Sequence, residues 1–122
     1  MQISRAESQV MEYLWDHHPA AASDVSAALG PVNGWSEATV KTLLGRLRNK
    51  GAVAAERDGR RFLYRPAIER DAWVLEESSH LVDRLFDGRL APLVSHFSSH
   101  GKLSQSDLDE LRQLIERLDD ER

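Results

Sequence analysis

The sequence predicts a mainly α-helical protein with one small β-hairpin, and three observations support this prediction. Apolar residues recur at helical spacing through most of the 122-residue chain. Residues 52–65 instead form two short strand-like runs on either side of Asp58-Gly59, a dipeptide favoured in two-residue hairpin turns. After Pro66 the pattern is helical again to the last residue. We therefore expect three helices and a hairpin in the first half and further helices in the second.

The first two expected helices are marked by their end signals. Ser4 and Glu7 have the spacing of a capping box, in which each side chain accepts a hydrogen bond from the other residue's backbone N–H. Pro19 ends this helix, because the residue before a proline resists the helical conformation. A short second helix is predicted over residues 24–29, followed by a turn-rich connector over residues 30–34 that begins with a glycine stop.

A third helix is predicted between Ser36, which suits the N-cap, and Gly51, which suits the position after the C-cap. Apolar residues at i, i+3, i+4 and i+7 form its buried stripe. The opposite face is small, polar and cationic, which suits close approach to a DNA major groove. The stripe consists of Val40, Leu43, Leu44 and Leu47, and the outer face of Ala38, Thr42, Gly45, Arg46 and Asn49, flanked by Thr39 and Lys41.

The hairpin that follows is basic at its tip. Strands are predicted at Ala52–Arg57 and Arg60–Arg65, with Phe62 and Tyr64 on one face of the second strand. A helix with a groove-compatible face followed by such a hairpin is typical of a winged helix-turn-helix domain. The predicted tip carries Arg57, Arg60 and Arg61.

The charge distribution favours a nucleic-acid partner although the net charge is −4. Residues 35–65 hold eight Lys/Arg and three Asp/Glu, whereas residues 71–122 hold six and twelve. A local basic patch attracts an anionic partner even on an acidic protein. The absence of cysteine excludes disulfides and thiolate sites. Because no long apolar run or signal-like segment is present, we expect no membrane insertion and a cytoplasmic location.

The second half of the chain is expected to dimerise. Its predicted helices are a long one that stops near Gly88, a shorter one over residues 90–97, and a last one capped by Ser104. So short a segment cannot bury all of its apolar side chains by itself, and a second copy of the chain is the predicted cover. The predicted interface consists of Leu81, Val82, Leu85, Phe86, Leu108, Leu111, Ile115 and Leu118.

No set of residues with catalytic spacing is evident, so we expect neither enzymatic activity nor a cofactor. His96 and His100 have the i, i+4 spacing of metal ligands, but no third ligand is nearby and no metal site is predicted. The remaining alternative to DNA binding is a winged-helix protein-interaction module whose basic surface meets an acidic partner. Short hydroxyls beside Arg46 favour DNA.

Motifs along nearly the whole chain carry a family resemblance. They are Ile3-Ser4-x-Ala6-Glu7-x-x-Val10-Met11 with Leu14-Trp15, then Trp35-Ser36-x-x-Thr39-Val40-Lys41-Thr42-Leu43-Leu44-x-Arg46-Leu47-x-x-Lys50-Gly51 with Gly59-Arg60, and Leu85-Phe86-Asp87-Gly88 with Leu93-Val94 and Leu103-Ser104. These motifs closely resemble the penicillinase-repressor family, which includes BlaI and MecI and has the copper-responsive repressors as relatives.

The resemblance implies a homodimeric transcriptional repressor with an N-terminal winged-helix DNA-binding domain, residues 1–68, and a C-terminal helical dimerisation domain, residues 69–122. Two such domains would bind a dyad-symmetric operator in double-stranded DNA, controlling β-lactamase-type or related stress genes. The DNA contacts implied by position are Ser36, Thr39, Lys41, Thr42, Arg46 and Arg60, and the charge of the hairpin adds Arg61.

The resemblance also implies that a membrane-bound sensor protease ends repression by cutting the repressor. The β-lactam-responsive members are cut at an Asn-Phe bond, and the matching pair here is His96-Phe97. A site built to hydrogen-bond one side chain discriminates against another. We therefore expect either a protease with a different preference or a non-proteolytic signal. The copper-responsive members carry a C-terminal cysteine cluster, which this chain lacks.

Overall fold

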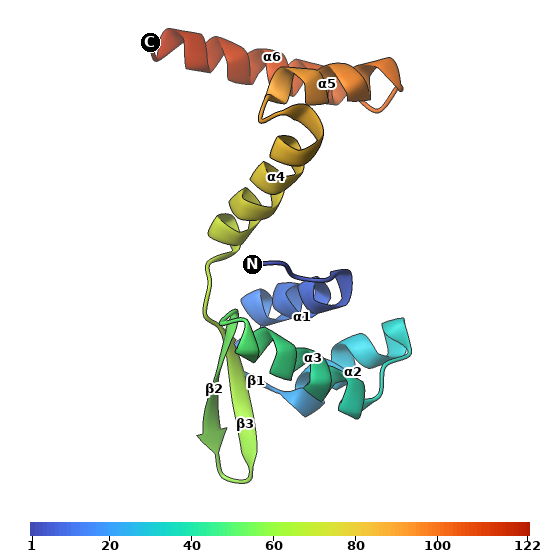
Figure 1. The fold of residues 1–122 in the computed structure, drawn as a ribbon, viewed down its shortest axis with the longest axis vertical. Helices are drawn as coiled ribbons and strands as arrows, with labels where there is room; N and C mark the ends of the chain where they lie inside the picture. Colours follow the sequence, from blue (N-terminus) through green and yellow to red (C-terminus); the bar gives the residue numbers. More distant parts are fainter. The chain divides into compact units, whose positions relative to one another are not determined.

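The computed structural model describes residues 1–122, and it confirms the predicted mainly α-helical fold (Figure 1). The chain forms two compact units, Met1–Glu77 and Ser78–Arg122, so the boundary between them falls inside a helix. The domain division at residue 68 stays a prediction. The elements in chain order are α1 (Arg5–Asp16), β1 (Ala20–Ala21), α2 (Ala22–Asn33), α3 (Glu37–Asn49), β2 (Val53–Asp58), β3 (Arg61–Pro66), α4 (Arg70–Phe86), α5 (Leu90–Ser99) and α6 (Gln105–Asp120).

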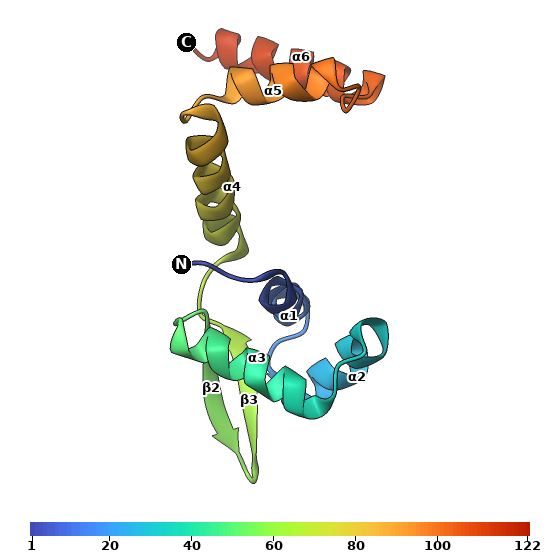
Figure 2. The ribbon, with the colours of Figure 1, turned by 45° about the vertical axis from the view of Figure 1, so that its right-hand side comes forward.

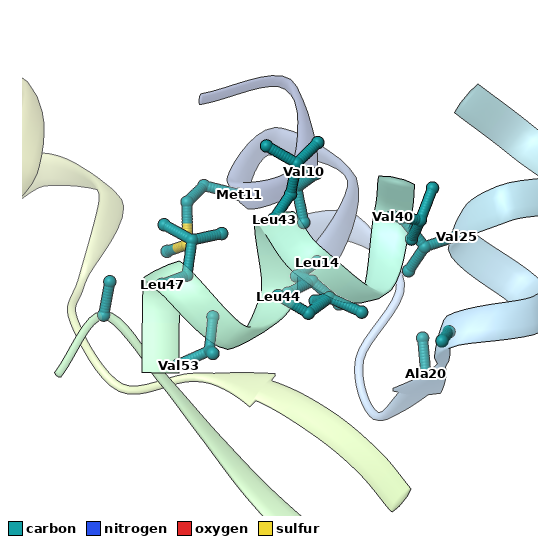
Figure 3. Close-up of a cluster of buried hydrophobic side chains, with 12 residues drawn as sticks. Val10, Met11, Leu14, Ala20, Val25, Val40, Leu43, Leu44, Leu47 and Val53 are labelled. Atoms are coloured by element: carbon teal, nitrogen blue, oxygen red, sulfur yellow. The ribbon is translucent and has the colours of Figure 1, made fainter. Parts of the chain in front are cut away.

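The N-terminal unit folds around one apolar core shared by its first three helices and the hairpin. Figure 3 shows side chains of α1, α2 and α3 converging between the helices, with Val53 closing the core from β2. Burying one such side chain contributes roughly 1.5–3 kcal/mol, so this cluster is the main source of the unit's stability. Its buried members are Val10, Met11, Leu14, Ala20, Ala22, Val25, Val40, Leu43, Leu44, Leu47, Ala52 and Val53.

The hairpin belongs to a three-stranded antiparallel sheet of order β1-β3-β2. The short strand β1 pairs Ala20 with Tyr64 and Ala21 with Leu63. A two-stranded wing was predicted, and that prediction missed β1 because two alanines carry no strand signal. β1 is a strand because it hydrogen-bonds to β3, which is far from it in the sequence.

The hairpin turn lies one residue later than predicted. The ladder pairs Arg57 with Phe62 and Asp58 with Arg61, so the turn residues are Gly59 and Arg60 rather than Asp58 and Gly59. Gly59 has a φ of 63°, and glycine at the first central position is typical of a type II′ turn. Asp58 instead extends β2 by one residue.

Helix α2 is longer than predicted. It continues through Gly30 and Pro31 and ends at Gly34, whose φ of 72° is left-handed. The predicted stop at Gly30 and the connector over residues 30–34 are therefore wrong. The Gly30 carbonyl accepts hydrogen bonds from the N–H groups of Gly34 and Trp35 at 2.7 and 3.1 Å, so the helix end has the backbone partners that it needs.

Gly30→Ala is expected to destabilise the N-terminal unit by about 1–3 kcal/mol through overpacking. An added Cβ would lie 2.9 Å from the backbone oxygen of Trp35. Gly45 in α3 is the matched control, because nothing lies within 4 Å of a Cβ built there. Gly45→Ala should stabilise by up to about 1 kcal/mol through helix propensity. Urea unfolding measures both, and a Gly30→Ala midpoint at or above wild type would contradict the prediction.

The C-terminal unit contains the end of α4 together with α5 and α6. Asp87 and Gly88 follow α4 with φ values of 53° and 77°, which ends the helix near the predicted position. Ser104 Oγ accepts from the Asp107 N–H at 3.0 Å and caps α6, as predicted. α5 and α6 lie side by side in both views (Figures 1 and 2). None of the helices combines the length and the apolar character needed to cross a bilayer.

Candidate nucleic-acid interface

Helix α3 is held by its buried stripe and turns a polar, cationic face outward. The four stripe residues predicted from the sequence are all buried. On the other sides of the helix Thr39, Lys41, Thr42 and Arg46 are exposed. Lys41 and Arg46 form no ion pair with any carboxylate of the chain. Both charges are therefore available to an external anion.

The hydroxyl groups of α3 and its N-cap already form hydrogen bonds within the helix. Ser36 Oγ accepts from the Thr39 N–H at 3.2 Å, so Ser36 is the N-cap that the sequence predicted. Ser36 Oγ also lies 3.1 Å from Thr39 Oγ1. Thr42 Oγ1 donates to the Ala38 carbonyl at 3.1 Å, which leaves its lone pairs free to accept. An acceptor on this face suits the amino groups of adenine or cytosine.

One face of the hairpin is neutralised by its own acids. Arg61 Nε pairs with an Asp58 carboxylate oxygen at 3.3 Å, and Arg65 pairs with Glu56. Arg60, in the turn, is exposed and has no such partner. Of the two arginines predicted as hairpin contacts, Arg60 therefore has an uncompensated charge, and the charge of Arg61 is already paired.

The eight side chains predicted to form a dimer interface divide by exposure. Four of them are exposed by between 42 and 59%, three are half-buried, and Val82 is only 8% exposed. Six further large apolar side chains of residues 69–122 are exposed and are not part of the predicted interface. The exposed predicted residues are Leu81, Leu85, Ile115 and Leu118, the half-buried ones are Phe86, Leu108 and Leu111, and the additional exposed ones are Val74, Leu75, Leu90, Val94, Phe97 and Leu114.

The predicted cleavage pair, His96 and Phe97, lies in α5, and Phe97 is 44% exposed. The His96 ring lies near three other rings, with centroid distances of 4.5 Å to His100, 6.0 Å to Phe86 and 6.1 Å to Phe97. No group of three or more His, Asp or Glu side chains is placed to hold a metal ion. Cleavage at this pair stays a prediction.

Comparison with known proteins assigns the chain to a family. A family model described as penicillinase repressor matches residues 3–117. The chain is also 34% identical to the penicillinase repressor of Bacillus licheniformis over 115 residues, which are 94% of this chain and 90% of that protein. The chain belongs to the penicillinase-repressor family. It is 28% identical over 116 residues to the methicillin resistance regulatory protein MecI of Staphylococcus aureus, covering 95% of this chain and 94% of that protein.

Solved structures confirm the winged-helix fold of the N-terminal unit. The DNA-binding domain of the repressor BlaI is 39% identical, with a TM-score of 0.53 over 57% of this chain and 84% of that one. Bacillus licheniformis BlaI in complex with the blaP half-operator is 38% identical, with a TM-score of 0.52 over 58% of this chain and 87% of that one. The winged helix-turn-helix domain Mb0332 of Mycobacterium bovis shares the fold at 24% identity and a TM-score of 0.50, covering 68% of this chain and 72% of that one.

Proposed function

We propose that this protein is a sequence-specific DNA-binding transcriptional repressor that acts as a cytoplasmic homodimer on a dyad-symmetric operator of β-lactamase-type or related stress genes. The exposed face of α3 is the observation that carries the proposal. Its hydroxyl groups and unpaired cations project from a helix whose opposite side is buried in the core. A similar repressor, BlaI, has been solved on an operator half-site. The proposal assigns no cofactor and no catalytic step to the chain.

Within α3, Arg46 is the proposed base-contacting residue. It lies one turn after Thr42 and its guanidinium has no intramolecular ion pair, so it can offer its fork to a guanine edge. Lys41 and Arg60 are proposed to contact phosphates, which fix the orientation of a protein on the duplex. The hairpin extends past α3 and away from α1 (Figure 2), so an α3 in the groove would bring the hairpin tip to the DNA backbone.

Arg46→Ala is expected to weaken operator binding by about 1–3 kcal/mol and to relax sequence preference at one position per half-site. Footprinting on the region upstream of its own gene supplies the operator, and fluorescence anisotropy measures the affinity. Arg112→Ala is the control, because it removes the same charge from an exposed position of α6. Equal losses on operator and mixed-sequence DNA for Arg46→Ala would contradict base contact.

A titration of duplex binding against salt tests the function itself. Phosphate contacts release counterions, so the affinity should fall steeply between about 50 and 200 mM salt. Lack of binding to any duplex at the low-salt end would contradict the proposal and would favour a winged-helix module that binds an acidic protein instead.

A further inference from the structure

The two faces of the hairpin differ in charge. Arg57 pairs directly with Phe62 across the ladder, so the two side chains share a face. Tyr64, two residues further along β3, lies on the same face and packs against the core. The acids of the hairpin, Glu56 and Asp58, point to the opposite face. The core-side face therefore carries a cation without a carboxylate.

A second arginine reaches the same aromatic ring from α3. The Cζ atoms of Arg48 and Arg57 each lie 5.8 Å from the centroid of Phe62. The ring thus joins the end of α3 to the hairpin, and it holds the two guanidinium groups within about twice that distance of each other. Phe62 is 40% exposed, so this cluster of three side chains is open to solvent.

The arrangement leaves two like charges together without a counter-charge. Neither Arg48 nor Arg57 forms an ion pair, and the only polar contact of Arg57 is from Nε to the Gly59 carbonyl at 3.3 Å. A cation–π contact orients each guanidinium group at the ring but does not neutralise its charge. An anion with more than one charged group would neutralise both.

We propose that Arg48 and Arg57, oriented by Phe62, form a two-point binding site for the phosphates of one DNA strand, located between α3 and the hairpin. The inference rests on the proposed function and adds two residues, Arg48 and Arg57, that are not among the DNA contacts proposed above. One strand carries a phosphate for about every 3.4 Å of helix axis and also winds around that axis, so two guanidinium groups that share one ring can contact neighbouring phosphates of the strand. The contact is independent of base sequence, because phosphates carry no sequence information.

The test uses a short mixed-sequence duplex as the probe, because backbone contacts need no operator. Affinities of the full-length chain, Arg48→Gln and Arg57→Gln are measured by anisotropy across about 50 to 200 mM salt. Each substitution should lower the salt slope by about one per protomer and weaken binding by about three- to tenfold at the upper salt concentration. Arg65→Gln is the matched control, since it removes an arginine that Glu56 already neutralises on the other face, and it should change the slope by less than half as much.

The contribution of Phe62 is measured by a mutant cycle. Phe62→Leu should weaken binding about threefold when both arginines are present and should have no effect in the Arg48→Gln, Arg57→Gln double variant. Phe62→Tyr keeps the ring and should bind like wild type. Circular dichroism melting checks that each variant is folded.

Two outcomes overturn the inference. One is a salt slope for Arg48→Gln and Arg57→Gln equal to that of Arg65→Gln, and the other is the same loss from Phe62→Leu with and without the arginines. Failure of the proposed function is a distinct result, in which the wild-type chain binds no duplex at any salt concentration.

Discussion

Replacing Ile115 and Leu118 together by Asp is expected to convert the protein from a dimer to a monomer. These residues are 56 and 53% exposed on one face of α6, next to Leu114 at 43%. A monomer that leaves such a row in water gains by covering it with a second copy. Burying unpaired carboxylates there costs several kcal/mol, so the dimer dissociation constant should rise at least about hundredfold.

Light scattering and analytical ultracentrifugation measure the oligomeric state. The variant should also bind a full dyad-symmetric operator little better than a half-site, because the second winged helix is no longer attached. Gln113→Asp is the matched control, since Gln113 lies on the opposite face of α6. A wild-type protein that is monomeric at micromolar concentration would refute the dimer.

Lys50→Met is expected to destabilise the N-terminal unit by about 3 kcal/mol, the lower end of the range for breaking a buried ion pair. Glu7 is 3% exposed, and Lys50 Nζ donates to its two carboxylate oxygens at 2.8 and 2.7 Å and to the Gln2 carbonyl at 2.8 Å. Without the ammonium group the buried carboxylate loses its charge partner. The lower end applies because the Lys50 side chain is 34% exposed.

The control for this prediction is the double variant Glu7→Gln, Lys50→Met, in which no charge is left unpaired and the Gln oxygen can still accept from the Ser4 N–H. It should be more stable in urea than Lys50→Met alone. A single Lys50→Met variant as stable as wild type would show that the pair does not contribute to folding.

The same pair predicts how stability depends on pH. Burial raises the pKa of Glu7, but hydrogen bonds from Lys50 and Ser4 and the charge of Lys50 outweigh burial, and the pKa is lowered from its ordinary value of 4.5. A lowered pKa means that the folded state favours the carboxylate, so its contribution is present above pH 4.5 and is lost as the pH falls through the folded-state pKa. Urea midpoints of wild type should therefore fall more steeply below that pH than those of Glu7→Gln. Parallel curves would contradict the assignment.

Signals within a few residues of one another were sufficient to predict where α1, α3 and α6 begin and which face of α3 is exposed. Ser4, Ser36 and Ser104 each cap a helix, as expected from the residues that follow them. A cap connects backbone and side-chain groups within one turn, so it can be read from adjacent residues. The buried stripe of α3 has the same local origin, because the helical period alone places its apolar residues on one side. The exposed candidates Thr42 and Arg46 followed from that period.

Contacts between residues far apart in the chain were decided by the tertiary structure. Strand β1 is formed by pairing with β3, and neither periodicity nor propensity marks two alanines as a strand. The pairing of β2 with β3 decides that Arg65 is neutralised by Glu56. The packing of α3 against the hairpin decides that Arg48 meets Phe62. Charge can be counted along a sequence, but whether a charge is paired or free depends on which side chains the fold brings within a few ångströms.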